Sequence, residues 1–229
     1  MTGRQLWQPL AALLFPERCP LCDEICVGGG VCGACREEAV HSPSLRSLGD
    51  GGLLCLAPYG YEGKLRDAIL RFKFEGRRDY VPFFAEQIAR EIRAQGLEVQ
   101  GAVLTPVPMS RRKKRERGYN QSQLLAQEVG RLLGIPCAEL LEKAGENQVQ
   151  HFLTAEERKR NVKGVYAMKK GIDRAEVILL DDIVTTGSTL LECAGTLRQA
   201  SSGLVQVRFC AALASDAKSG GCKAESGIL

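Results

Sequence analysis

The chain has 229 residues, of which 45% are apolar, and its 31 Lys and Arg residues only slightly outnumber its 27 Asp and Glu residues. This composition suits a soluble globular protein with one main domain and a small appendage. Ten cysteines in a chain of this size, without a recognisable cleavable signal sequence, argue against a disulfide-bonded secreted miniprotein. We therefore expect reduced thiols and a cytoplasmic location.

The positive charge is concentrated in one segment. RRKKRER at 111–117 holds six cations and one acid, and the rest of the chain has 25 cations against 26 acids. The composition therefore predicts a local basic site and not a generally basic protein.

The chain begins with an apolar segment, LWQPLAALLFP at 6–16. It is too short to span a bilayer, and Gln8 and Pro9 interrupt it. We interpret it as a short helix that packs on its own protein, and we expect no membrane span.

Four cysteines follow in two C-x-x-C pairs, CPLC and CGAC, separated by nine residues. Two such pairs on neighbouring tight turns can bring four thiolates around one tetrahedral Zn²⁺, which then organises a segment with hardly any core. The alternative is a redox motif or buried small apolar residues, which the recurrence of the pair disfavours. The predicted zinc ligands are Cys19, Cys22, Cys32 and Cys35.

Regular secondary structure is predicted from residue 53 onward. An extended segment at 53–63 precedes a helix at 64–76, whose apolar residues follow a 3.6-residue period, and a second helix at 81–95. From about residue 101, continuously apolar strands alternate with helices, which predicts a parallel sheet covered on both faces. The predicted strands are 102–108, 136–141, 164–168, 176–182 and 205–214, and the predicted helices are 120–134 and 188–200.

The segment EVILLDDIVTTGSTL at 176–190 carries the strongest functional signal. In an open parallel sheet, ligands bind where strands end at their carboxyl side and helices begin. Small hydroxylated residues at such a turn can surround a phosphate with N–H groups and hydroxyls, helped by the positive end of the helix. The predicted phosphate ligands are Thr185, Thr186, Gly187, Ser188 and Thr189.

Asp181 and Asp182 directly precede that turn. They cannot contact the same phosphate, so we expect them to face a sugar diol or Mg²⁺ with its water shell. Phosphate, diol and metal together describe a phosphorylated pentose. The alternative is a surface turn in which Asp182 or Ser188 only caps a helix. That alternative does not explain two acids directly after four apolar residues.

The segment VILLDDIVTTGSTL resembles the phosphoribosyl-pyrophosphate (PRPP) signature of type I phosphoribosyltransferases. Further motifs resemble one branch, the ComF or GntX-like family, which is associated with bacterial competence. They are the paired cysteines after LLFPERCPLC, YEGKLRDAILRFKFEG, PVPMSRRKKRERGYNQSQLLA and QHFLTAEERKRNVKG at 150–164. With the signature they cover nearly the whole chain in order.

The resemblance implies an α/β fold of the type I phosphoribosyltransferase kind, with a mostly parallel five-stranded sheet flanked by helices. It also implies a small zinc-ribbon module. The expected division is an N-terminal helix and zinc module at 1–50, a phosphoribosyltransferase-like domain at 51–214 and a flexible tail at 215–229. Within that domain we expect a hood at 53–95 and a core at 101–214.

The resemblance implies a role for each motif. Asp181 and Asp182 would bracket the ribose 2′ and 3′ hydroxyls, and the hydroxylated turn would hold the 5′-phosphate. The segment 105–118 stands in the place of the pyrophosphate loop, where cations and loop N–H groups stabilise the leaving group. The predicted pyrophosphate ligands there are Arg115, Arg117, Gly118 and Asn120. For Arg111, Arg112 and Lys113, a solvated loop is an equal alternative.

The segment 142–164 stands in the place of a mobile loop that closes over the reacting centre and excludes water. We expect Arg158, with Arg160 and Asn161, to reach the pyrophosphate when the loop closes. His151 is a candidate proton donor, although a lone exposed histidine is more often without a function.

The implied reaction is the Mg²⁺-dependent transfer of a phosphoribosyl group from PRPP to a nitrogen acceptor, with release of pyrophosphate. A second hypothesis is a non-catalytic protein that senses PRPP or a nucleotide and docks on proteins of DNA uptake or recombination. The zinc module and the basic run fit this hypothesis, since clustered cations attract nucleic acid. Direct binding of single-stranded DNA ranks last, because Tyr119 alone supplies an aromatic side chain beside the run.

Overall fold

A computed structural model describes the chain at 17–26, 30–38, 41–143, 164–169 and 174–216. The predicted N-terminal helix, Arg158, Arg160, Asn161, His151 and nearly all of the tail lie outside these ranges. Within them, no helix is both long and apolar enough to cross a membrane.

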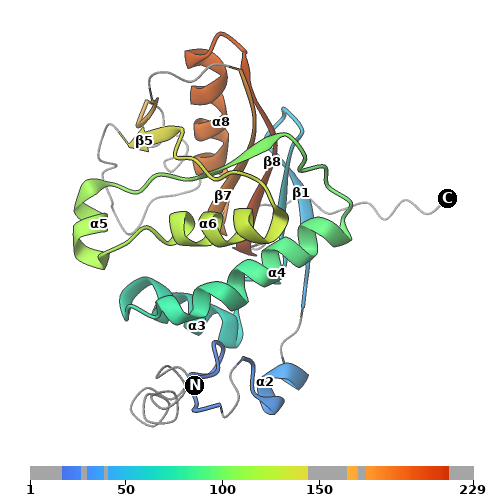
Figure 1. Cartoon of the computed structure of the whole chain (residues 1–229), viewed down its shortest axis with the longest axis vertical. Coiled ribbons are helices and arrows are strands. Elements are labelled where there is room, and N and C mark those ends of the chain that lie inside the picture. Colours follow the sequence, from blue (N-terminus) through green and yellow to red (C-terminus); the bar gives the residue numbers. More distant parts are fainter. Residues whose placement is uncertain (1–16, 27–29, 39–40, 144–163, 170–173, 217–229) are drawn as a thin grey trace, which may run out of the picture.

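A mostly parallel sheet forms the centre of the described part of the chain (Figure 1). Its strand order is β1-β2-β8-β7-β4, and β3 also pairs with β8. The neighbours β2–β8, β3–β8, β8–β7 and β7–β4 are parallel, whereas β1 is antiparallel to β2. The strands are β1 (Ser44–Leu48), β2 (Leu53–Ala57), β3 (Tyr59–Gly60), β4 (Ala102–Pro106), β7 (Ala175–Val184) and β8 (Val205–Ser215).

Helices cover both faces of the sheet, as the apolar strands predict. Ile178 and Leu180 of β7 belong to the core beneath α3, α4 and α6, while Val177 and Leu179 face the core beneath α8. Successive side chains of a strand point to opposite faces, so a strand covered on both sides is apolar throughout. The helices are α2 (Gly33–Glu38), α3 (Gly63–Phe74), the 3-10 helix η1 (Arg78–Tyr80), α4 (Val81–Ala94), α5 (Arg111–Arg117), α6 (Gln121–Leu133) and α8 (Ser188–Ala200).

Three predicted strands differ from the structure. The predicted strands 136–141 and 164–168 mostly leave the main sheet: Cys137 forms a single parallel bridge with Leu104, and β5 (Leu141–Lys143) pairs antiparallel with β6 (Tyr166–Met168). Strand β7 runs two residues past Asp182, because its pairing with β8 continues to Val184. Strand β1 joins the sheet although it lies within the segment assigned to the zinc module.

The basic segment is a helix and not the loop that we predicted. The side chain of Ser110 caps α5 by accepting a hydrogen bond from the backbone N–H of Lys113 at 3.3 Å. Gly118 ends the helix in the left-handed conformation at φ +78°, which favours glycine. Because these caps form α5, most of the backbone N–H groups of RRKKRER are directed along a helix and are not free to surround an anion.

The cysteine segment packs against α3 and η1 (Figure 1). Arg71 of α3 donates to the carbonyl of Leu21 at 2.5 Å, and Leu21 is buried in the core that α3 covers. Asp23 accepts a hydrogen bond from the hydroxyl of Tyr80 at 2.6 Å and forms an ion pair with Arg77. Helix α3 therefore lies between the cysteine segment and the sheet domain and contacts both.

Candidate active site

Strand β7 brings Asp181 and Asp182 to the carboxyl edge of the sheet, where side chains of helices α6 and α3 contact them. The hydroxyl of Ser122, in the first turn of α6, donates to Asp181 Oδ1 at 2.8 Å, and the backbone N–H of Asp182 donates to the same oxygen at 2.8 Å. The ammonium of Lys73, in the last turn of α3, lies 2.9 Å from Asp182 Oδ2. Each acid thus has its own partner from a different helix.

The two acids disfavour one another's charge. Burial, followed by the neighbouring charge of Asp182, raises the pKa of Asp181 to about 6. The hydrogen bonds from Ser122 and from the backbone of Asp182 oppose that rise, as does the charge of Lys73. Asp181 is therefore partly protonated near neutral pH, and it ionises more easily when a cation or a hydroxyl donor approaches.

The residues after β7 form a small pocket next to Asp181. The hydroxyls of Thr186 and Ser188 lie 2.7 Å apart, and the backbone N–H of Ser188 donates to Thr186 Oγ1 at 3.3 Å. Helix α8 begins at Ser188, so its unpaired N–H groups and its positive end face the turn. The lining residues are Asp181, Ile183, Val184, Thr185, Thr186, Gly187, Ser188, Thr189 and Leu190.

Strand β1 supports this turn from outside the signature. Gly187 has φ +78°, and a Cβ at this position would lie 2.7 Å from Cδ2 of Leu48 in β1. Arg46 of the same strand donates to the carbonyl of Thr185. Only glycine fits between the left-handed backbone and Leu48, which explains the glycine among four hydroxylated residues.

The predicted pyrophosphate ligands do not gather in one place. Arg115 is exposed on α5. Arg117 lies over the ring of Phe74, 4.7 Å from the ring centroid, and donates to Gln121 Oε1 at 3.3 Å. Both arginines are thus on the basic helix, but Arg117 is directed toward α3 and α6.

Gly118 and Asn120 have structural roles in the same segment. Gly118 ends α5, and Asn120 begins α6 by accepting from the backbone N–H of Ser122 at 3.1 Å. The side-chain amide of Asn120 donates to the carbonyl of Val107 at 3.0 Å, which ties α6 to the segment after β4. Asn120 thereby places Ser122 next to Asp181.

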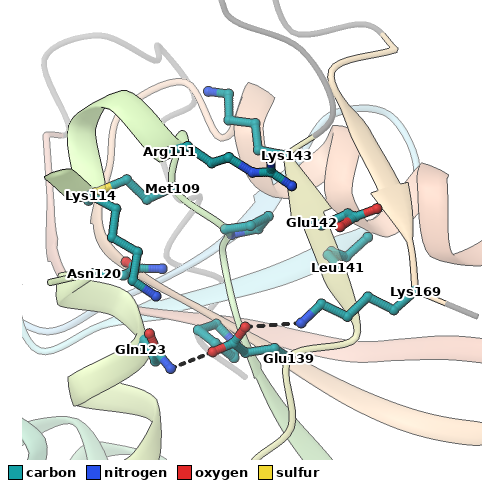
Figure 2. Close-up of a pocket in the computed structure, with 12 residues that line it drawn as sticks. Met109, Arg111, Lys114, Asn120, Gln123, Glu139, Leu141, Glu142, Lys143 and Lys169 are labelled. Carbon is teal, nitrogen blue, oxygen red and sulfur yellow. Dashed lines mark hydrogen bonds and ion pairs between the residues drawn. The ribbon is translucent and has the colours of Figure 1, made fainter.

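A second pocket opens beside the end of β4, and Figure 2 shows its charged lining. It measures about 200 Å³ and lies between α5, the start of α6 and the β5–β6 ribbon. Glu139 is bonded to the amide of Gln123 and to the ammonium of Lys169, the latter at 3.0 Å. Of the predicted pyrophosphate ligands, Asn120 lines this pocket. The cations that line it are Arg111, Lys114, Lys143 and Lys169.

The four predicted zinc ligands come together. The sulfur atoms of Cys19, Cys22, Cys32 and Cys35 all lie within 4.8 Å of one another, with Cys22 and Cys32 at 3.7 Å. Four sulfurs around Zn²⁺ at about 2.3 Å would be separated by about 3.8 Å, so the cluster fits a tetrahedral ion.

The thiols of this cluster do not ionise equally. Burial opposes ionisation of Cys19, but backbone hydrogen bonds from Cys32, Cys22 and Leu21 outweigh it and lower its pKa to about 6. Burial and the neighbouring sulfurs raise the pKa of Cys35 to about 12. A divalent cation at the centre would relieve this repulsion and favour four thiolates.

Comparison with known proteins assigns the family. No family model matches the chain. The DNA utilization protein YhgH of Salmonella typhimurium is 30% identical over 183 residues, which cover 77% of this chain and 75% of that protein. The chain belongs to the ComF family. Competence protein F of Haemophilus influenzae is 31% identical over 61% of this chain and 64% of its own, and Competence protein ComFC of Bacillus subtilis is 28% identical over 75% and 68%.

Solved structures with a similar backbone include adenine phosphoribosyltransferases. One has a TM-score of 0.41 and 15% identity over 78% of this chain and 88% of its own, and that of Saccharomyces cerevisiae has a TM-score of 0.40 and 15% identity over 80% and 89%. The fold of this ComF-family chain is α/β, with a mostly parallel sheet flanked by helices and a compact cysteine module.

Two residues that contact Asp181 and Asp182 were not predicted from the sequence. Lys73 lies in RFKFEG, where it reads as a solvated residue of an amphipathic helix, and Ser122 reads as an ordinary residue of the helix after Asn120. Both belong to motifs that carry the resemblance to the ComF family, but spacing alone does not connect them with residues 181 and 182. One signal in the sequence could have pointed to them: both are polar residues in these motifs for which the sequence suggests no partner.

Replacing Asp181 by Asn should stabilise the ligand-free protein at pH 7.5 by about 2 kcal/mol, because one pKa unit is worth about 1.4 kcal/mol and partial exposure reduces the effect. The pKa of Asp181 in the folded state, about 6, lies above its ordinary value of 3.8. The stability lost through the ionised carboxylate therefore grows as the pH rises from about 4 to about 6 and is constant above that, and the advantage of Asn should vanish below about pH 4, where both states hold the proton.

Urea unfolding of both proteins between about pH 4 and 8 measures this difference. The side-chain oxygen of the introduced asparagine can still accept both hydrogen bonds, so the comparison isolates the charge. Equal stability of the two proteins at pH 7.5 would show that Asp181 is not destabilised by burial.

Proposed function

We propose that this chain is a PRPP-binding protein of the phosphoribosyltransferase class that transfers a phosphoribosyl group to a nitrogen acceptor. The observation that supports this most is the continuous pocket from Asp181 to Leu190. At one end it offers the carboxylate of Asp181 for a sugar diol, and at the other it offers hydroxyls and the N-terminus of α8 for a phosphate. That order of groups matches a ribose 5-phosphate lying along the turn.

The pocket of Figure 2 is our candidate for the pyrophosphate of PRPP. The strands that lead to the two pockets, β4 and β7, are neighbours in the sheet, and the backbone N–H of Val107 donates to the carbonyl of Leu180 at 2.9 Å. The cations that line the pocket suit a dense negative charge, and Arg111 and Lys114 reach it from α5 (Figure 2). The proposed anion ligands are thus side chains of a helix and not the loop N–H groups that we expected from the sequence.

Asp181 and Asp182 are the residues that would hold Mg²⁺ or its water shell, since carboxylate oxygens are the donors that this ion prefers. When bound, the ion would supply neutralising charge to the pyrophosphate oxygens. In the proposed reaction the bond from ribose C1 to the pyrophosphate oxygen breaks, and its electron pair leaves with pyrophosphate. A bond from the acceptor nitrogen to C1 forms, and that nitrogen releases a proton to solvent.

The protein with Mg²⁺ should bind PRPP, and the double variant Asp181→Asn, Asp182→Asn should bind it at least about 30-fold more weakly, because the diol loses two charged acceptors. Calorimetry gives both affinities. Asp67→Asn removes an acid whose side chain is 58% exposed on α3 and should change nothing. Absence of PRPP binding to the unaltered protein would reject the proposed function.

Removing two cations of the second pocket should weaken the binding of the pyrophosphate part of PRPP and not that of its ribose 5-phosphate part. Arg111→Ala with Lys114→Ala should weaken PRPP binding by about 10-fold or more, because two charge-assisted contacts are lost, and should leave the affinity for ribose 5-phosphate nearly unchanged. Arg112→Ala serves as the matched control, because Arg112 lies on the same helix, pairs with Glu116 and does not line the pocket. An equal loss for both ligands would place the pyrophosphate elsewhere.

We also propose that the cysteine cluster holds one structural Zn²⁺. The purified protein should contain about one equivalent of zinc, and Cys32→Ser with Cys35→Ser should lose it and lower the thermal stability, since metal binding organises such segments. Elemental analysis and thermal unfolding measure both effects. Cys55→Ser is a control outside the cluster, and a zinc-loaded, normally stable double variant would disprove the assignment.

A second candidate function is a sensor that binds the same ligand without turnover and docks on proteins of DNA uptake. The exposed cations of α5 and the names of the relatives, DNA utilization protein and competence protein, favour it. Pyrophosphate release from PRPP with a panel of amines and bases distinguishes the candidates. Turnover with one acceptor supports the transferase, and binding without turnover supports the sensor.

A further inference from the structure

Lys73 lies on the amphipathic helix α3, yet its side chain is largely buried and contacts an acid. Its ammonium lies 2.9 Å from Asp182 Oδ2, and the two side chains are only 14% and 13% exposed. Elsewhere on α3, Arg66 is 54% exposed and pairs with its neighbour Asp67 at 3.6 Å. Burying a lysine and an aspartate together costs desolvation that their attraction repays only in part, so stability alone explains the Lys73 contact poorly.

The backbone at Lys73 is fixed by the segment that also holds the other acid. The amide of Gln121 donates to the carbonyl of Lys73 at 3.5 Å, and the hydroxyl of Tyr119 donates to the carbonyl of Phe72. The next residue along that segment, Ser122, donates to Asp181. The start of α6 therefore positions both acids, one by direct contact and the other through Lys73.

Other cations surround the same carboxylates. Lys113 of α5 is half-buried, and burial together with the charges of Arg117, Lys73 and Arg112 lowers its pKa, while Asp182 opposes that effect. The charged groups that act on or near Lys73 are thus Asp182 and, farther away, Asp181 and Lys113. Cations converge on an acid pair that, by itself, would repel an anionic ligand.

We propose that Lys73 is a positioning residue of the ligand site: its ammonium orients Asp182 and compensates the charge of the acid pair, so that the pair can accept the diol of a negatively charged sugar phosphate. This role rests on the proposed function and adds a residue from outside the PRPP signature. Without the ammonium, two adjacent carboxylates would face a polyanion, and the affinity for that ligand would fall.

The proposal predicts a change in affinity that depends on the charge of the ligand. Lys73→Met should weaken the binding of PRPP with Mg²⁺ by about 10- to 100-fold, as expected when one partner of a buried charge pair is removed. Because PRPP carries more negative charge than ribose 5-phosphate, its affinity should fall more than that of ribose 5-phosphate. Lys73→Arg keeps the charge and should restore most of the affinity, and Arg66→Met on the same helix should behave like the unaltered protein.

Calorimetry measures the affinities for PRPP and ribose 5-phosphate, and a crystal structure of ligand-free Lys73→Met shows whether Asp182 keeps its orientation. A loss of affinity together with a displaced Asp182 supports the role. An unchanged affinity and an unchanged Asp182 overturn it. If the unaltered protein binds no PRPP, the proposed function fails, and the orientation of Asp182 in the ligand-free variant still decides the role of Lys73.

Thermal unfolding of each variant shows whether the fold is retained. Lys73→Gln, which keeps a hydrogen-bond donor, replaces Lys73→Met in both measurements if the methionine variant does not fold. Weaker PRPP binding in a folded variant whose Asp182 keeps its orientation would contradict the positioning role and assign Lys73 to direct contact with the ligand.

Discussion

Two carboxylates side by side at the end of a buried strand are the constraint on which the rest of the site depends. Burial and, to a smaller extent, the adjacent charge of Asp182 raise the pKa of Asp181. The fold meets this cost with one partner for each acid, Ser122 for Asp181 and Lys73 for Asp182. The carboxylate oxygens can accept further hydrogen bonds or bind a cation. A sugar diol and Mg²⁺ are both suitable partners.

Helix α3 connects this site with the cysteine cluster. Its Arg71 binds the carbonyl of Leu21 between the cysteines, and its last turn carries Lys73 to the acids. Its inner face is fixed by Phe72, which packs on Phe84 with ring centroids 5.6 Å apart. A metal that orders the cysteine segment would therefore also support the helix that presents Lys73. This gives the cysteine module a physical relation to the ligand site, although the two are far apart in sequence.

The basic segment shows how a local feature changes the chemistry available to a site. We predicted an anion-binding loop, but the caps at Ser110 and Gly118 form a helix, so side chains replace backbone N–H groups as ligands. The direction of each side chain then decides its use. Arg111 and Lys114 face the pocket of Figure 2, Arg117 lies over Phe74, and Arg115 is exposed. The segment holds six cations, and the position of each along the helix decides whether its side chain faces the pocket.

The sequence by itself determined the features that depend on neighbouring residues. These are the helices at 64–76 and 120–134, the apolar strands of a two-sided sheet, the acid and hydroxyl motif of β7, and the cysteine spacing. The tertiary structure decided what depends on distant contacts. Lys73 and Asp182 are 109 positions apart, β1 reaches Gly187 from an N-terminal segment, and β5 pairs with β6 instead of extending the sheet. Periodicity and turn chemistry act within a few residues, whereas such contacts arise only when several elements pack together.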